Sequence, residues 1–179
     1  MSSPIRPTDD DARALALSLL GSARIAALAV LTPDGGPLVT RVGFGCAPDG
    51  VPMTLISDLA AHSQALRSDP RCSLLIGEAV GKGDPLNQPR LSLQATAGFL
   101  DRTSSEHEKM AAHYLRDHPK ARLYVGFADF AFAIFTVTRG HLNAGFGKAF
   151  ALTPADLGLA PIPAGARRET PIDPSAQSR

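Results

Sequence analysis

The sequence predicts an α+β protein, mainly β, in which one antiparallel barrel of short strands carries peripheral helices. Three observations predict this fold class. Six or so short segments have the composition of strands, and two of them, residues 38–46 and 90–102, alternate with period two. Turns rich in Gly, Pro and Asp join consecutive segments, and such tight connections favour antiparallel neighbours. Segments with helical periodicity lie between some of the strands, which places helices around the barrel.

The first half of the chain is expected to form a helix, a hairpin and a further strand, helix and strand. The opening helix follows Thr8, has three acidic residues in its first turn, and ends near Gly21. After it we expect, in order, a strand, a turn, a strand, a turn, a strand, a helix and a strand, at residues 25–31, 32–37, 38–46, 47–50, 52–57, 59–67 and 72–78.

The second half begins with a loop rich in Gly and Pro at residues 79–89. Ser105 and Glu108 have capping-box spacing, so we expect them to begin a helix that ends before Pro119. The remaining segments are a long strand, a short helix that starts at the proline, a strand, and a continuation of the sheet, at residues 90–102, 119–124, 130–137 and 141–150.

Size and composition suit one well-packed domain, because 44% of the 179 residues are hydrophobic. We expect this domain to occupy residues 1–160 and a flexible tail rich in Pro and Ala to occupy residues 161–179. A net charge of +1 disfavours nucleic-acid partners. No stretch approaches the roughly 18 to 20 apolar residues of a membrane span, so we expect a soluble protein of the cytoplasm without a membrane partner.

Alternation along residues 38–46 separates a core face from an outward face. The core face carries Leu38, Thr40, Val42 and Phe44, and the outward face carries Val39, Arg41, Gly43 and Gly45. On the outward face a flat ligand could lie close to the glycine backbone while the Arg41 guanidinium contacts a phosphate or a ring edge. A solvated arginine on a bulged strand is the alternative.

The segment from Ser57 to Ser63 joins a strand to a helix and contains the ingredients of an anion site. Hydroxyl groups, the His62 imidazole and the unpaired backbone amides of a helix start can all bind a phosphate. The candidates are Ser57, Asp58, His62 and Ser63. In the alternative, Asp58 is the N-cap of the helix and His62 and Ser63 are surface residues.

The cysteines and most histidines are explained by structural roles rather than by catalysis or metal binding. Cys46 and Cys72 lie in predicted strands without CxxC spacing, as small buried side chains do. A surface amphipathic helix accounts for most of the remaining histidines and their acidic neighbours, so no metal site is predicted at His107, His113, His118 or His141. Classical nucleotide loops and a GxSxG nucleophile elbow do not occur.

Three ordered stretches resemble one family. They are residues 57–63 (SDLAAHS), residues 83–86 (GDPL) with 89–93 (PRLSL), and residues 118–121 (HPKA) through 126–130 (GFADF). They resemble the flavin split-barrel proteins related to pyridoxamine 5'-phosphate oxidase, in the branch that includes haem-utilisation proteins, and the likeness runs from the opening helix to Ala151. The resemblance implies a six-stranded split barrel of Greek-key type that binds FMN at a homodimer interface and acts on a small-molecule redox substrate.

The resemblance also implies roles for the two sites described above. Arg41 and Val42 would follow the flavin, and Ser57, His62 and Ser63 would surround its phosphate. No acid or base is required of the protein, since FMN would supply the redox chemistry and the protein would position it.

Four further residues are candidates or matches on the later strands. Arg90 and Gln94 could contact the cofactor, but Arg90 could equally anchor the preceding loop and Gln94 could be an ordinary outward residue. Arg139 and His141 have a suitable spacing for the oxidase's substrate-binding Arg and His, without a secure match to that pair.

The chain departs from the oxidase at its phosphate motif, because His62 and Ser63 stand where the oxidase usually has Arg and Lys, and Ala65 where related barrels often have Asn. These changes predict a lower affinity for phosphate. The chain ends soon after Phe150, so the further C-terminal domain of longer haem-degrading relatives is not expected. The alternatives are a haem-binding or haem-degrading protein on the same barrel, a flavin-binding module without turnover, and a barrel without flavin.

Overall fold

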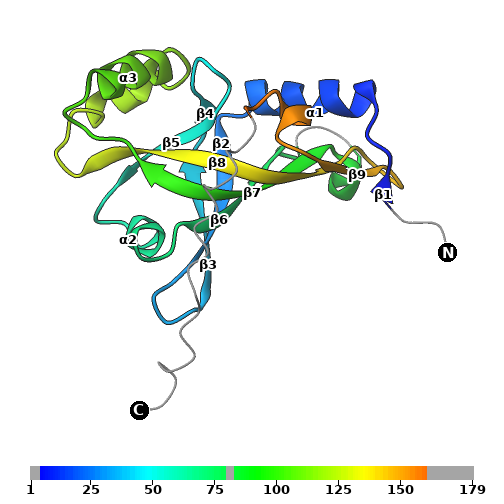
Figure 1. The fold of residues 1–179 in the computed structure, drawn as a ribbon, viewed down its shortest axis with the longest axis horizontal. Helices are drawn as coiled ribbons and strands as arrows, with labels where there is room; N and C mark the ends of the chain where they lie inside the picture. Colours follow the sequence, from blue (N-terminus) through cyan, green and yellow to red (C-terminus); the bar gives the residue numbers. More distant parts are fainter. Residues whose placement is uncertain (1–4, 80–82, 161–179) are drawn as a thin grey trace.

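One curled sheet organises the chain, with helices on both of its sides (Figure 1). The structure is a computed structural model and describes residues 5–79 and 83–160. The strands in these ranges are β1 (Ile5–Arg6), β2 (Ile25–Leu31), β3 (Pro37–Gly43), β4 (Gly45–Cys46), β5 (Pro52–Ser57), β6 (Arg71–Ile76), β7 (Arg90–Phe99), β8 (Phe130–Asn143) and β9 (Ala149–Leu152). The helices are α1 (Asp10–Ser22), α2 (Ala61–Ser68) and α3 (Ser105–Asp117), with short 3₁₀ turns η1 (Pro85–Asn87), η2 (Pro119–Leu123) and η3 (Ala155–Leu157).

The sheet follows the order β1-β9-β8-β7-β6-β2-β3, and β5 adds to it by pairing with β8 and β4. Strand β8 is long enough to pair with two strands along the same edge: residues 130–134 pair with β5 and residues 140–143 pair with β9. Every strand pair in the described ranges is antiparallel except β1 with β9. The predicted antiparallel barrel with peripheral helices is confirmed, and β2, β3, β5, β6, β7 and β8, each of at least six residues, are compatible with six main strands.

Local chemistry explains the elements whose ends were predicted well. Strands β2 and β5 have the predicted bounds, since turns with Gly or Pro precede or follow them. Helix α1 begins where Asp9 accepts a hydrogen bond from the Ala12 N–H at 2.8 Å. The predicted capping box of α3 was wrong by one residue, because Ser104 is the N-cap and accepts from the His107 N–H at 3.1 Å.

The inner face of the sheet forms the main core. Its fully buried side chains include Leu28, Leu74, Leu91, Leu93 and Phe135, from strands β2, β6, β7 and β8. Burying a side chain of this size contributes about 1.5–3 kcal/mol. A second cluster lies under α3 and η2 and contains Met53, Leu55, Tyr114, Ala121 and Phe132.

The helices lie around the curled sheet. In the view of Figure 1, α1 and α3 lie above the strands and α2 below them; because the sheet is curled, buried residues of both α1 and α2 still join the main core. The predicted tail at residues 161–179 is outside the described residues, and the domain range 1–160 stays a prediction. No helix within residues 5–79 or 83–160 is long and apolar enough to cross a membrane.

Candidate functional site

The outer face of the central sheet carries two rows of side chains that cross five strands. Directly paired residues on neighbouring strands lie side by side on one face, so the register defines these rows. One row is Val39, Ala29, Ser73, Gln94 and Arg139. The next is Arg41, Ala27, Leu75, Ser92 and His141.

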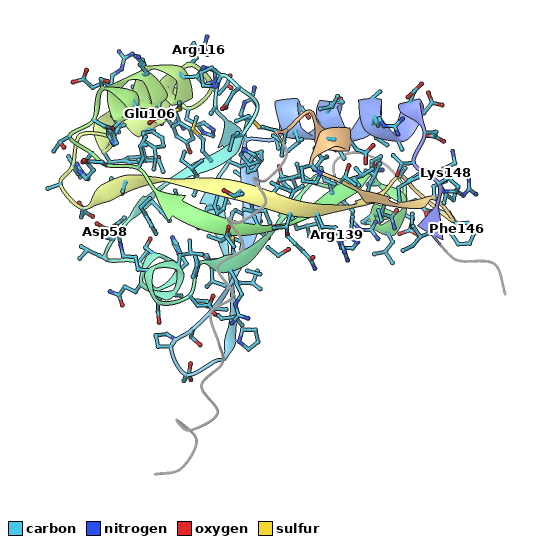
Figure 2. The ribbon with its side chains drawn as sticks, in the orientation of Figure 1. Asp58, Glu106, Arg116, Arg139, Phe146 and Lys148 are labelled. Atoms are coloured by element: carbon cyan, nitrogen blue, oxygen red, sulfur yellow. The ribbon has the colours of Figure 1, made fainter. Side chains whose placement is uncertain are left out.

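Part of this outer face, over β2 and at Ser73 of β6, is low because its side chains are short, and two ends of the rows carry arginines. Ala27, Ala29 and Ser73 form the floor, while Arg41 lies at one end and Arg139 at the other. We call the surface formed by both rows the outer groove. Arg139 lies on the side of the sheet that faces away from α1 and α3 (Figure 2). A flat anionic molecule fits a low floor with cations at its edges.

Two hollows occur along the outer groove. The larger has a volume of about 520 Å³ and is lined in part by Ala29, Ser73, Gln94 and Thr138. The smaller, of about 160 Å³, lies beside Arg41. The Arg41 side chain is exposed and forms no hydrogen bond or ion pair with another residue in the described part of the chain. Its guanidinium is therefore available to a ligand.

The two glycines beside Arg41 do not form the expected ligand surface. Tyr114 of α3 packs against both, so a Cβ at Gly45 would lie 3.4 Å from the Tyr114 ring and Gly43 has no room for one. Tyr114 is held by a stacked His118, whose ring Nε2–H donates to the Phe44 carbonyl at 2.8 Å. The predicted surface over these glycines was wrong, and the alanines of β2 provide the low floor instead.

Val42 also needs a more exact placement than the sequence allowed. Its side chain is buried in the core. Only its backbone could contact a ligand on the outer face. The alternation predicted this orientation correctly.

The start of the predicted anion segment is tied to the loop before β8. The Ser57 hydroxyl donates to the Asp129 carboxylate at 2.5 Å and accepts from the Leu59 N–H at 3.2 Å. The Asp58 N–H donates to the Asp129 carbonyl at 2.6 Å. Since the single hydroxyl proton of Ser57 is engaged by Asp129, Ser57 holds the turn and would donate to an anion only after releasing that carboxylate.

Helix α2 begins without a side-chain cap. Ala60 is its N-cap, so the N–H groups of Ala61 and His62 lack an intrahelical acceptor by helix geometry. Asp58 does not cap the helix, because its carboxylate accepts from the Arg67 Nη2 at 2.5 Å and Nε at 3.2 Å. The N-cap alternative for Asp58 was wrong.

Ser63 is not a surface residue, and His62 is only partly exposed. Ser63 is 0% exposed, and neither its Oγ nor the buried Nε2 of His62 has a hydrogen-bond partner in the described structure. Burial lowers the pKa of His62, which keeps the imidazole neutral near pH 7. Buried polar atoms normally find partners, so two orphans in the first turn of an uncapped helix indicate a place for a ligand with acceptor oxygens.

The structure brings the two predicted sites onto neighbouring elements. Helix α2 packs against β2 and β3, the strands that carry the alanine floor and Arg41. Its buried residues Ala65 and Leu66 belong to the same core cluster as the inward side chains of these strands. Within the described ranges no hydrogen bond joins Arg41 to residues 57–63, so the two sites lie on neighbouring elements and are not one bonded cluster.

The two candidates on β7 have different surroundings. The Arg90 guanidinium donates to the Leu86 carbonyl at 2.8 Å and to the Gln88 carbonyl at 3.3 Å, as the loop-anchor alternative requires. Gln94 is exposed in the outer groove, opposite Ser73 and Arg139. Of this pair, Gln94 is the residue that faces a ligand.

His107 and the two cysteines contribute packing. His107 is 8% exposed and packs edge-on against Phe132, so the predicted surface helix does not account for it. Cys46 and Cys72 are unpaired and half-buried, and burial raises the pKa of Cys72 to about 12, which leaves an unreactive thiol. No group of three metal-ligating side chains occurs among the residues that the structure describes.

Sequence reasoning missed two features of this surface. The alternation of residues 25–31 already places Ala27 and Ala29 together on the face away from the core, a signal that could have been read. The contact of Arg67 with Asp58 spans nine positions across a turn and a helix, and no local pattern announces it.

Comparisons with known proteins agree with this fold. A sequence profile of the family described as pyridoxamine 5'-phosphate oxidase matches residues 13–143. The chain is 33% identical over 99 residues to the chloroplastic non-canonical heme oxygenase HOZ of Arabidopsis thaliana, which covers 55% of this chain and 29% of that protein.

Solved structures give the same picture. A heme binding protein from Mycobacterium smegmatis is 28% identical with a TM-score of 0.76, covering 86% of this chain and 61% of the other. A further structure is 44% identical with a TM-score of 0.77, covering 85% of this chain and 99% of the other. The chain thus spans less than a third of the plant relative and about three fifths of the mycobacterial one.

Proposed function

This chain belongs to the pyridoxamine 5'-phosphate oxidase family, and from that premise we propose that it is a flavoprotein that binds FMN and uses it to oxidise or reduce a small molecule. The family includes oxidoreductases, and FMN would supply the redox chemistry. The residues of this chain bind, orient and electrostatically stabilise the cofactor.

The start of α2 is the observation that carries this proposal. The Ser63 hydroxyl and the His62 Nε2 are buried without partners beside the free N–H groups of an uncapped helix. The phosphate of FMN offers acceptor oxygens that satisfy such donors, and the helix dipole favours their negative charge. The residues present therefore fit the phosphate end of the cofactor.

The outer groove fits the ring end. Its floor of short side chains allows a planar ring to approach the sheet, and Arg41 provides a positive charge at its edge. A guanidinium there stabilises the negative charge that develops when the ring is reduced. Gln94 offers an amide to the polar edge of the same ring.

A second copy of the chain completes the proposal. Val39 and Leu75 are 63% and 43% exposed on the outer face. Apolar side chains in such positions commonly mark an interface. Covering them with the partner's sheet would bury the cofactor between two protomers, in a homodimer.

Haem is a second candidate ligand that two relatives support. The Arabidopsis relative is named a heme oxygenase, and the mycobacterial structure is a heme binding protein. Haem is also flat, and its two carboxylates would pair with cations such as Arg41 and Arg139 at the groove ends. No axial iron ligand is assigned.

Titration with the two cofactors tests the proposal. We expect FMN to bind with quenching of its fluorescence and a protein-bound flavin spectrum, and riboflavin to bind at least tenfold more weakly because it lacks the phosphate. Ser63→Ala should reduce that preference, whereas Ser68→Ala, at the exposed far end of the same helix, should preserve it. A Soret shift with haemin and no response to FMN would replace flavin by haem.

A further inference from the structure

The connection between β5 and α2 carries a carboxylate next to the anion site. Asp58 lies two residues before the N-cap Ala60, and its side chain is 37% exposed. A second carboxylate, that of Asp129, is close by and accepts from Ser57. A phosphate bound at the start of α2 would be repelled by both carboxylates, because all three groups are negatively charged, and this repulsion would weaken binding.

Arg67 compensates the charge of Asp58. Its Nη2 and Nε both donate to Asp58 Oδ1, at 2.5 and 3.2 Å. Asp58 faces Arg67 rather than the helix amides, and this leaves those amides without a side-chain cap. The bond therefore removes an internal competitor for the amides and neutralises its charge.

A second contact, with an aromatic ring, fixes the position of the Arg67 guanidinium. The guanidinium carbon lies 3.9 Å from the centroid of the Phe99 ring at the end of β7. Stacking on an aromatic face and forked donation to a carboxylate are both properties of arginine that lysine lacks. Phe99 at the end of β7 therefore orients Arg67, and Arg67 in turn orients the Asp58 carboxylate.

We propose that Arg67 is a positioning residue for the phosphate site, which keeps Asp58 neutralised and off the α2 amides so that an anionic group can bind there. The proposal rests on the FMN binding proposed above. It adds that selectivity for the phosphorylated flavin depends on a residue that need not touch the phosphate.

The test compares the FMN affinity of variants that differ in charge at Asp58 and Arg67. Dissociation constants for FMN and riboflavin would be measured by fluorescence quenching for the wild type, Arg67→Ala, Arg67→Gln, Asp58→Asn and Asp58→Asn/Arg67→Ala. We expect Arg67→Ala and Arg67→Gln to weaken FMN about five- to tenfold, as an uncompensated carboxylate within several ångströms would. Riboflavin affinity should change less than about twofold.

The other two variants separate charge from structure. Asp58→Asn should bind FMN as tightly as the wild type or tighter, and the double variant should return to within about twofold of the wild type. The deficit of Arg67→Ala should shrink at high salt. If Arg67 merely braces the fold, FMN and riboflavin weaken together and the double variant is not rescued, which would overturn the proposal.

Arg24 and Asp117 provide a matched control. They form an ion pair at 3.2 Å with side chains 44% and 46% exposed, between the α1–β2 connection and the end of α3. Arg24→Ala should leave the FMN preference unchanged. Wild-type protein that binds no FMN would overturn the proposed flavin function and this proposal together, whereas normal FMN binding by Arg67→Ala would overturn this proposal alone.

Discussion

The two faces of strands β2, β6 and β7 differ in chemistry although their residues alternate one by one. The inner face carries Leu28, Leu74 and Leu93, all fully buried. The outer face at the neighbouring positions carries Ala27, Ala29, Ser73 and Gln94, with Leu75 43% exposed among them. The inner face therefore stabilises the fold, and the outer face is available for binding. Substitutions one residue apart should separate stability from affinity.

The largest expected effect comes from the inner face. Leu93→Ala should lower the free energy of unfolding by about 3 kcal/mol, because it removes packed atoms and leaves a cavity in the main core. Gln94→Ala, one residue further, should change it by less than about 0.5 kcal/mol. Urea denaturation followed by circular dichroism measures both. Equal losses would mean that the outer face is also part of the packed structure.

Arg41 should show the converse behaviour. Removing its charge in Arg41→Ala should weaken FMN roughly tenfold or more, as losing a bond to a charged group does, with little change in stability. Flavin fluorescence and the midpoint potential of the bound cofactor would be measured together. Unchanged affinity and potential would remove Arg41 from the site, and Arg41→Lys shows whether charge alone suffices.

Adding bulk to the floor of the outer groove should also affect ligand affinity more than stability. Ala29→Leu adds bulk where the ring is proposed to lie, so flavin or haem affinity should fall about tenfold while stability changes by less than about 1 kcal/mol. Riboflavin should lose as much affinity as FMN, since the phosphate lies elsewhere. Affinity equal to that of the wild type would show that the ring binds away from this floor.

The same contrast explains what could be read from the sequence. Alternation and turn residues are local signals, and they predicted β2, β5 and the inward side chain of Val42. Glycines 43 and 45 were misread because their neighbour Tyr114 comes from a helix some seventy positions later.

Orphan polar atoms are a tertiary property as well. A sequence shows that a serine occurs near a helix start, but burial and the lack of a partner at Ser63 appear only after the chain has folded. The resemblance to a known family pointed to the same segment, because its motifs occur in the family's order. Motif order locates a site in the sequence but does not give the geometry of its side chains.

The smallest expected effect is the pH response of the anion site. Burial lowers the pKa of His62 below its ordinary value of 6.5, so the folded protein binds fewer protons there than the unfolded chain. Stability from this group is therefore full above pH 6.5 and falls as the pH drops below it, by no more than about a few tenths of a kcal/mol because the ring is partly solvated. His62→Asn should remove that part of the pH dependence in urea melts between pH 7 and 5.

Bound FMN should cancel the same response in the wild type. A phosphate beside the imidazole favours its charged form, so the folded pKa rises toward or above the unfolded one and the loss of stability below pH 6.5 disappears. Riboflavin has no phosphate and should leave the response in place. If FMN and riboflavin alter the pH dependence equally, the phosphate does not lie beside His62, and the link between the orphan atoms of α2 and the cofactor fails.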